Sequence, residues 1–484
     1  MCRKKNLYAI AATLLTLNQK STIGNKIRHL QIVVCVTISM ICISSLCYSQ
    51  AIQPLRYNDD FSYLKDDSSR RHKLHLKYIK LLGNNNYVSV GGEIRQQIMY
   101  LKNISFGEIS SSFKTATTWQ TLHRMMLHLN VDLGKNVRVF TQAYSTMRFI
   151  NPNPKSAVDQ NDLDLHQAFV DFKPSRQVTL RLGRQEYLFG KERFMGVREG
   201  PNNRQTFDAA TVKYSSDKVT ADIYYAKQII PAPGVFDDKN SGEHIAGIYT
   251  RFTAVPQRAL FEFDFHAFGS RTRTYNYTIG TERRKTAGFR FYSLNKILNY
   301  EIESATQWGS FMDKTIKAYS VAYDVNYLLN KRLLAGLSGN FFTGDKDPAD
   351  NEINTYNTMF GKPPYGQAAM QGLANSKNIN PYLRVYLNTN VNVLGGMNIV
   401  RRVSNKDAVY SNGMRVIRPQ AEDKLLDYSS GKIGQVFNLD VNLKFGNNFS
   451  ATIQGATYVA NDFIKQSGKS NQVYFFSTRG VYRF

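Results

Sequence analysis

The sequence has little cysteine and tryptophan, and its longest apolar run ends at residue 46. All four cysteines, Cys2, Cys35, Cys42 and Cys47, lie near the N-terminus. The rest of the chain therefore has no thiol for a disulfide or a zinc site, as suits a protein that crosses an oxidising compartment. A mean hydropathy of −0.38 is too polar for a bundle of membrane-spanning helices. No repeat, low-complexity tract or long helical periodicity is present either.

Acidic residues are scarce as well: 37 Asp and Glu stand against 62 Lys and Arg, which gives a net charge of +25. Such a balance can indicate nucleic-acid binding. An N-terminal export signal and a long series of alternating strands argue against it. Aromatic residues are abundant, with 29 Tyr and 29 Phe, and they favour strands and membrane interfaces. A length of 484 residues allows two or three ordinary domains or one very large barrel.

The N-terminus has the features of an export signal. Lys20, Lys26 and Arg28 precede an apolar run at residues 32–46, and a small residue, serine, stands at position 49. This order predicts that residues 1–49 are removed on export. Their loss takes away six basic residues and lowers the net charge from +25 to +19.

Two alternatives for the N-terminus are a retained helical anchor and a lipoprotein signal at Cys47. The second is disfavoured because Leu46 stands where a small residue is needed. Residues 50–86 are polar and of mixed charge. They are predicted to be a short periplasmic lead-in without a function of its own.

Residues 87–484 are dominated by strict alternation of apolar and polar residues, as in residues 219–225 and 437–445. This period predicts β-strands with one apolar face. Roughly 18 strand candidates can be counted, which is within the range of bacterial outer-membrane barrels. The predicted fold is all-β: an antiparallel up-and-down transmembrane barrel.

The lengths of the connections distinguish a barrel from a soluble sandwich, because they alternate between long and short. The long connections are expected at residues 101–119, 151–161, 188–206, 229–243, 270–283, 343–378, 405–430 and 461–470. The short ones are expected at residues 134–136, 173–176, 215–217, 256–257, 330–331 and 446–448. One link, residues 309–313, is shorter than its place in the series predicts.

The last strand ends on Phe484, with Tyr482 on the same face and Arg483 on the other. A terminal aromatic residue on an alternating strand is similar to the signal by which bacterial barrels are recognised for assembly. The barrel-assembly machinery is therefore an expected partner, beside outer-membrane lipid and lipopolysaccharide.

The chain is organised around residues 178–214, where two strand-like runs flank a basic loop. The loop carries Lys191, Arg193, Arg198 and Arg204. One interpretation is that this loop folds into the barrel and narrows the pore. The alternative is a hairpin with a solvated loop.

Several motifs resemble the alginate-export family of outer-membrane barrels. They lie at residues 88–97, 121–133, 165–172, 178–214 and 341–366. The resemblance implies an 18-stranded barrel whose positively charged pore passes a uronate polymer in the outer membrane of a Gram-negative bacterium. By position it implies the pore arginines Arg124, Arg181, Arg184, Arg193 and Arg204. Arg95 and the carboxylates Asp171 and Asp208 are further candidates for the pore lining.

Guanidinium groups pair with carboxylates through two parallel hydrogen bonds, and charged rings lower the barrier for a counter-ion in a pore. Nearby carboxylates would keep the polymer from sticking. The alternative is that these charges pair across the lumen and hold the barrel's shape. Arg184 falls on the face of Leu182 in a regular strand, so it needs a bulge, or a place above the membrane, to reach the lumen.

Other chemistries find less support. Asp345, Asp347, Asp350 and Glu352 lack the full spacing of a calcium loop, and no run supplies a recognisable catalytic triad. We therefore expect no enzyme and no cofactor. The predicted function is a passive outer-membrane channel for an alginate-like polyuronate. A general anion or oligosaccharide uptake porin is the main alternative, and a barrel-embedded hydrolase is the third.

Overall fold

Antiparallel strands make up most of the chain in the computed structural model. The structure describes residues 53–67, 71, 74–83, 85–253, 259–366, 368–369, 371–419 and 430–484. The predicted export signal, residues 1–49, and the first residues of the predicted lead-in lie outside these ranges. No helix of the described residues is long and apolar enough to cross a membrane.

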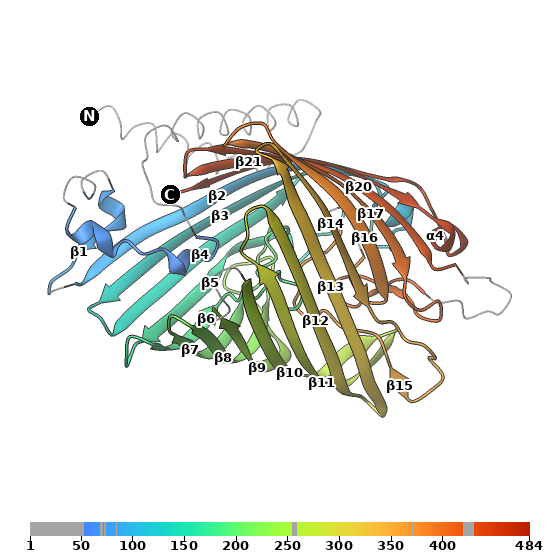
Figure 1. The fold of residues 1–484 in the computed structure, drawn as a ribbon, viewed down its shortest axis with the longest axis horizontal. Coiled ribbons are helices and arrows are strands. Elements are labelled where there is room, and N and C mark those ends of the chain that lie inside the picture. The colour runs from blue at the N-terminus through green and yellow to red at the C-terminus, as the bar shows by residue number, and fades with distance from the viewer. Residues whose placement is uncertain are drawn as a thin grey trace.

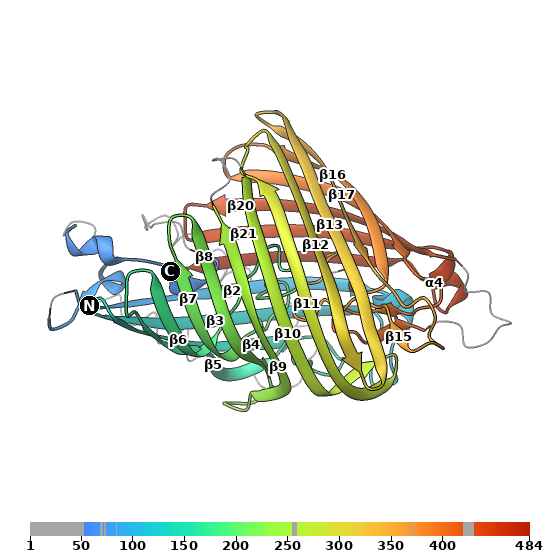
Figure 2. The same cartoon turned by 60° about the horizontal axis from the view of Figure 1, so that its bottom comes forward.

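One sheet contains 20 strands, of which two are two-residue additions, β1 (Ile79–Lys80) and β15 (Glu352–Ile353). The other 18 form a closed barrel (Figures 1 and 2). They are β2 (Tyr87–Lys102), β3 (Thr118–Leu133), β4 (Val137–Phe149), β5 (Asn161–Phe172), β6 (Val178–Gln185), β7 (Phe207–Ser215), β8 (Val219–Ile230), β9 (Lys239–Phe252), β10 (Ala259–Tyr275), β11 (Thr278–Ser293), β12 (Leu298–Phe311), β13 (Lys314–Asn330), β14 (Leu333–Phe342), β16 (Ser376–Tyr386), β17 (Val391–Arg402), β20 (Lys432–Phe445), β21 (Phe449–Ala460) and β22 (Val473–Arg483). The predicted fold class is confirmed.

The remaining elements are short and are not part of the barrel wall. They are the 3-10 helices η1 (Arg56–Asn58), η2 (Ser62–Lys65), η3 (His75–Lys77) and η4 (Ile104–Gly107), the α-helix α4 (Asp462–Gln466), and a hairpin of β18 (Val409–Tyr410) and β19 (Val416–Arg418).

The barrel closes where the first long strand, β2, pairs with the last, β22. Gly92 and Phe484 complete this seam by exchanging two backbone hydrogen bonds, of 2.9 and 3.1 Å. A side chain at Gly92 would stand 2.5 Å from the carbonyl oxygen of Met126 and 2.6 Å from the Phe484 ring, so the seam needs glycine there. Closure leaves no strand edge, which a bilayer requires because lipid cannot hydrogen-bond to the backbone.

The predicted alternation of long and short connections is confirmed for most of the barrel. The predicted short turns at 134–136, 173–176 and 446–448 each join two strands at the end of the barrel where the C-terminus lies (Figure 1). Long connections such as residues 343–375 lie at the other end. The short turn predicted at residues 256–257 lies outside the described residues.

The long loop predicted at residues 270–283 is wrong. β10 continues to Tyr275 and β11 begins at Thr278, so only Asn276 and Tyr277 form the turn. Both have positive φ, 43° and 68°, as tight hairpin turns that match strand twist require. The polar residues here extend the strands instead of forming a loop. The short link at residues 309–313 likewise belongs to two long paired strands, β12 and β13.

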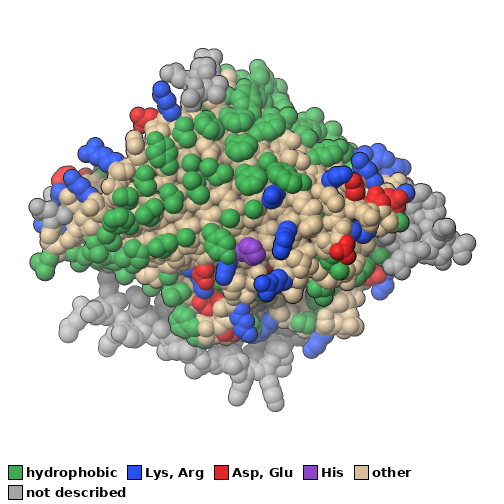
Figure 3. All heavy atoms as spheres, turned by 90° about the horizontal axis from the view of Figure 1, so that it is seen from below, with side chains coloured by type: hydrophobic (Ala, Val, Ile, Leu, Met, Phe, Trp, Pro, Cys, Tyr) green, Lys and Arg blue, Asp and Glu red, His purple; other side chains and the backbone are tan. Residues whose placement is uncertain are grey.

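The alternation along each strand separates a lipid face from a lumen face. On β3, Leu127 and Leu129 keep 46% and 38% of their surface exposed, whereas His128 and Asn130 keep 2% and 6%. Apolar side chains consequently cover much of the outer wall (Figure 3). An apolar outer band around a polar interior is typical of outer-membrane barrels.

The part of the lead-in that the structure describes packs into the end of the barrel that carries the short turns. Tyr57 is buried edge-on against Phe140 and Phe169, with ring centroids 6.1 and 5.4 Å away. Arg56 donates to the terminal carbonyl oxygen of Phe484 at 3.3 Å. The segment is therefore bound to the barrel and does not trail from it.

We expect the end with the short turns and the C-terminus to face the periplasm. Trypsin added to intact cells should then cut after Lys346, which is exposed in the long connection between β14 and β16, because residues 354–361 of that connection are buried. It should spare the exposed Lys135 in the turn between β3 and β4 until the outer membrane is opened. Mass spectrometry of the fragments checks this. A Lys346→Gln variant should lose the first cut, and cleavage at Lys135 in intact cells would invert the topology.

Candidate functional site

Two long connections fold into the barrel and meet. We call residues 186–206, between β6 and β7, the first inward loop, and residues 354–366, between β14 and β16, the second. Met195 and Phe360 form a parallel bridge, and the backbone N–H of Phe360 donates to the carbonyl oxygen of Phe194 at 2.9 Å. The prediction that the first loop folds inward is confirmed.

Apolar and aromatic side chains explain why the first inward loop leaves water. Tyr187, Phe189 and Met195 join one buried cluster with Phe207 and Phe360. Glycine allows the two loops to approach: a side chain at Gly361 would stand 2.2 Å from the carbonyl oxygen of Arg193. The loops therefore form a packed body inside the barrel.

Arg124 and Arg95, two of the predicted pore residues, hold the first inward loop against the wall. Arg124 is fully buried and donates to the Glu93 carboxylate at 2.6 and 3.1 Å and also to Glu199. Arg95 donates to the carbonyl oxygens of Glu199 and Pro201 at 2.8 and 3.0 Å. Burial alone would raise the pKa of Glu199, but the surrounding guanidinium groups, Arg124 first, hold that pKa well below its usual range.

Arg204 closes the other end of the same loop. It lies 2.8 Å from the carboxylate of Glu186, which also contacts His166 at 2.7 Å. Arg204 further donates to the carbonyl oxygen of Pro54 in the lead-in at 3.4 Å. The buried pair therefore fixes both ends of the loop and the lead-in together.

Arg181 and Asp171 form a third buried cluster, near the predicted periplasmic end. Arg181 donates to Asp171 at 2.7 and 3.0 Å, and Arg138 donates to the same carboxylate at 3.0 Å. The Arg181 guanidinium lies 4.2 Å from the centre of the Tyr57 ring and 3.9 Å from that of Phe169, within the range of cation–π attraction. Burial raises the pKa of Tyr57 to about 12, so its hydroxyl stays protonated and donates to the Glu186 carbonyl oxygen at 3.1 Å.

Arg193 joins the first inward loop to the wall at β12. It lies 2.9 and 2.6 Å from Glu301 and Glu303 of β12. Glu301 is shared with Arg290 of β11 at 2.9 Å. The predicted alternative, in which charges pair across the lumen and hold its shape, therefore describes Arg193 well.

Arg184 and Asp208 lie outside the lumen, and their assignment to the pore is corrected here. β6 is regular enough to place Arg184 on the lipid-side face with Leu182, which is 63% exposed. Arg184 pairs there with Asp208 of β7 at 2.8 Å. No bulge turns the arginine inward.

Three of the carboxylates that neutralise these arginines, Glu93, Glu186 and Glu199, were not predicted from the sequence. Glu93 is two residues before Arg95 on β2, so the alternation of the strand predicts that both side chains point into the lumen. Glu186 and Glu199 lie in a loop, where no period indicates direction. Their partners are defined only by the way the loop folds.

Two other arginines that the sequence analysis did not select lie on the inner wall: Arg384 of β16 and Arg479 of β22. Within the described ranges, neither has a carboxylate oxygen within 4.0 Å. Arg384 makes one long hydrogen bond to Asn392 at 3.4 Å. Arg479 pairs in register with the buried Gln97 and shares its face with the buried Ser477.

The acidic loop considered for calcium does not gather its carboxylates. Glu352 pairs with Lys317, and Asp350 accepts the backbone N–H of Glu352 at 2.8 Å. Three other carboxylates, Asp164, Asp237 and Asp238, do lie with oxygens within 4.8 Å of one another. They are already served by protein donors, for example Asn161 to Asp238 at 2.6 Å.

A closed 18-stranded barrel with an apolar outer wall and loops folded into its lumen is the architecture of an outer-membrane channel. The sequence pattern of the family described as "Alginate export" matches residues 86–477. The chain belongs to the alginate export family and is an outer-membrane protein of a Gram-negative bacterium.

Solved structures support the fold. The barrel is similar to that of Pseudomonas aeruginosa OpdK with vanillate, with a TM-score of 0.56 and 8% identity over 82% of this chain and 98% of that one. It is similar to Pseudomonas aeruginosa OpdQ, with a TM-score of 0.55 and 10% identity, and to Acinetobacter baumannii OccAB4, with a TM-score of 0.52 and 10% identity, each over 82% of this chain and 98% of the other. None of the curated proteins compared with the chain matches it in sequence.

The buried pairs predict how the first inward loop responds to substitution. Glu186→Gln removes a carboxylate that is 1% exposed and leaves Arg204 without it. Breaking a buried pair from one side costs roughly 3–5 kcal/mol, so the temperature at which the barrel unfolds in detergent should fall and open-channel current noise should rise. Gel mobility after graded heating and single-channel recording measure the two effects.

Lys362→Gln is the matched control, because it removes an exposed pair between the same two loops, Lys362 with Glu192 at 3.4 Å. Exposed pairs contribute about 0–1 kcal/mol. Equal effects of the two substitutions would show that the buried cluster does not hold the loop.

Proposed function

We propose that the protein is a passive outer-membrane channel for an acidic polysaccharide, an alginate-like polyuronate. Family membership supports the substrate class. The observation that carries the proposal for this chain is the pair of lumen-facing arginines, Arg384 and Arg479, which lack carboxylate partners among the described residues. A guanidinium group that no carboxylate contacts can pair with a substrate carboxylate through two hydrogen bonds.

The arginines selected from the sequence have a different part in this proposal. Arg95, Arg124, Arg181, Arg193 and Arg204 are held by carboxylates or carbonyl oxygens, so they shape the lumen and contribute little free positive charge. In this proposal the polyanion is attracted by Arg384 and Arg479, which lie on β16 and β22. The channel needs no energy source, and the direction of movement follows the concentration gradient of the polymer.

A second candidate function is uptake of small anions or oligosaccharides. The inward loops favour it, because they fill part of the lumen with packed side chains. One structural neighbour, OpdK, is described with vanillate, a small carboxylate. Single-channel current distinguishes the two functions: block by long uronate chains supports the first, and equal passage of short neutral sugars supports the second.

Replacing both Arg384 and Arg479 with Gln should shift the reversal potential in planar bilayers toward cation preference and weaken block by a uronate oligomer at least about tenfold, as expected for the loss of charge-assisted hydrogen bonds. In the unchanged protein, anion preference should fall as salt rises, because screening acts over about 8 Å at physiological salt.

Arg184→Gln is the matched control, since that arginine lies on the outer face and should leave selectivity unchanged. If the double variant keeps the anion preference and the block, Arg384 and Arg479 are not the source of selectivity and the proposal loses its support in this chain.

We also propose that the C-terminal strand is read by the barrel-assembly machinery. The Phe484 ring packs on Tyr482 at a centroid distance of 6.0 Å on the outer face of the seam. Deleting Phe484 removes two backbone hydrogen bonds as well as the terminal aromatic ring. The amount of heat-modifiable barrel in the outer membrane should fall several-fold.

Phe484→Ala separates the two causes, because it keeps the backbone pairing with Gly92. A similar loss in both variants supports recognition of the ring, whereas a loss in the deletion alone points to the seam. Normal yield in both would contradict a role in assembly.

A further inference from the structure

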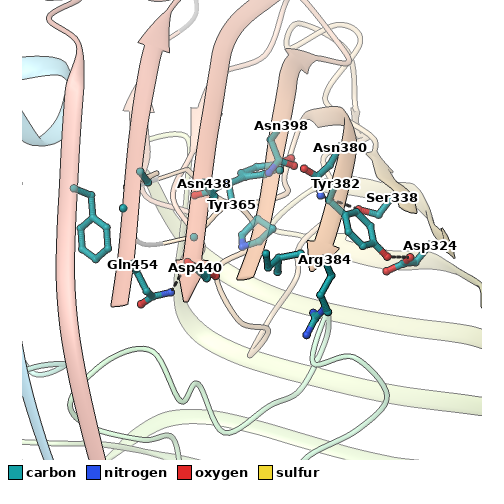
Figure 4. A pocket seen from close by; sticks show the side chains of 17 residues that line it. Asp324, Ser338, Tyr365, Asn380, Tyr382, Arg384, Asn398, Asn438, Asp440 and Gln454 are labelled. Atoms are coloured by element: carbon teal, nitrogen blue, oxygen red, sulfur yellow. Dashed lines mark hydrogen bonds between the residues drawn. The ribbon is translucent and has the colours of Figure 1, made fainter. Parts of the chain in front are cut away.

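The inner wall formed by β13–β22 differs from the wall that holds the first inward loop. It surrounds a cavity of about 320 Å³ whose polar lining is made chiefly of amides and hydroxyls (Figure 4). That volume is at the lower end of the range of ligand pockets, roughly 300–1,000 Å³. The cavity is lined by residues of seven strands, β13, β14, β16, β17, β20, β21 and β22, and by Pro364, Tyr365 and Gly366 at the end of the second inward loop.

Amides on neighbouring strands form a connected row above the cavity. Asn340 donates to Asn378 at 2.8 Å, and Asn378 donates to Asn398 at 2.8 Å. At the next inward position of β16, Asn380 donates to Ser338 at 3.1 Å. The row fixes the orientation of these amides, so their remaining groups face the lumen in a defined way.

Two acceptors and two carboxylates complete the lining. Asn380 Oδ1 and Gln454 Oε1 are buried oxygen atoms with no hydrogen-bond partner within the described structure. Asp324 accepts the hydroxyl of Tyr382 at 2.7 Å, and Asp440 accepts the amide of Gln454 at 3.2 Å. A buried acceptor without a donor is costly, so a donor that reaches either oxygen from the cavity would relieve that cost.

The wall is hollowed at this level by small residues. Gly396 and Ala456 stand where the neighbouring inward positions carry Tyr382 and Phe475. A side chain at Gly396 would lie 3.1 Å from Asn380 Oδ1 and 3.2 Å from Cβ of Tyr382, and would close the hollow.

The chemistry of the lining selects a class of ligand. An amide offers a donor and an acceptor side by side, which matches adjacent hydroxyl groups on one sugar ring. A lipid tail would find too little apolar surface. A simple anion could pair with Arg384 at the edge of the cavity but would leave the amides unused.

From this lining we infer that the cavity is a saccharide-binding site, which holds one sugar ring by its hydroxyl groups while Arg384 at its edge takes the carboxylate of a uronate. The inference deepens the proposed channel function, and it rests on that proposal only where it calls the sugar acidic. A neutral oligosaccharide should bind at the same amides without using the arginine.

Single-channel block by two oligosaccharides of equal length tests the site, one a uronate oligomer and one neutral. The double variant Asn380→Leu with Gln454→Leu removes both partnerless acceptors and should shorten the residence time of both blockers at least about tenfold, the loss expected for about two net hydrogen bonds. Arg384→Gln should shorten residence of the uronate oligomer alone.

Asn442→Leu is the matched control: it lies on the same face of β20 as Asp440 but does not line the cavity, and it should change either residence time less than about threefold. Ala456→Leu is a second variant that fills the cavity without removing a polar group. It should act like the double variant, and it keeps the test valid if the double variant does not assemble.

Unchanged residence times of both blockers in the assembled cavity variants would overturn the inference. So would an effect confined to the uronate oligomer. If the unchanged protein shows no anion preference but neutral block depends on Asn380 and Gln454, the saccharide site stands and the acidic-polymer function fails. If anion preference depends on Arg384 and Arg479 while the amides have no effect, the reverse holds.

Discussion

The structure depends on closure of the backbone hydrogen-bond ladder between β2 and β22. A bilayer offers no donors or acceptors, so every strand must find two neighbours. The close approach of Gly92 to Phe484 and Met126 completes that ladder at the end of the chain. Once the wall is closed, all inward-pointing side chains face one lumen. Every second residue of each strand points inward, so the strand sequences determine which side chains line that lumen.

The two halves of the lumen solve the burial of polar groups in different ways. On the β2–β12 side, arginines and carboxylates neutralise one another through the first inward loop, as Arg124 does with Glu93 and Glu199. Buried charges are tolerated when they are paired and hydrogen-bonded. On the β13–β22 side, the cavity is lined by amides such as Asn380 and Asn398 together with three charged side chains, Asp324, Asp440 and Arg384. The polar groups on this side are therefore served mainly by amide hydrogen bonds and less by ion pairs.

Period-two alternation predicted the strands, because a barrel wall has one apolar and one polar face, and the alternation of long and short connections predicted that the strands form a membrane barrel. The same parity correctly placed Arg184 beside Leu182, where the family resemblance did not. Sequence could not predict which arginines are neutralised. Arg193 and Glu301 are far apart in the chain and meet only because a loop folds inward. Nor could it separate a polar loop from polar strands that extend past the membrane, as in the β10–β11 hairpin.

The lead-in is tied to three parts of the chain that lie far from it in sequence. Arg56 binds the terminal carbonyl of Phe484, Pro54 accepts from Arg204, and Tyr57 donates to the carbonyl of Glu186. The first contact needs the last strand in place, and the other two need the first inward loop inside the barrel. All three together therefore exist only in a barrel that is closed at β22 and holds its first inward loop.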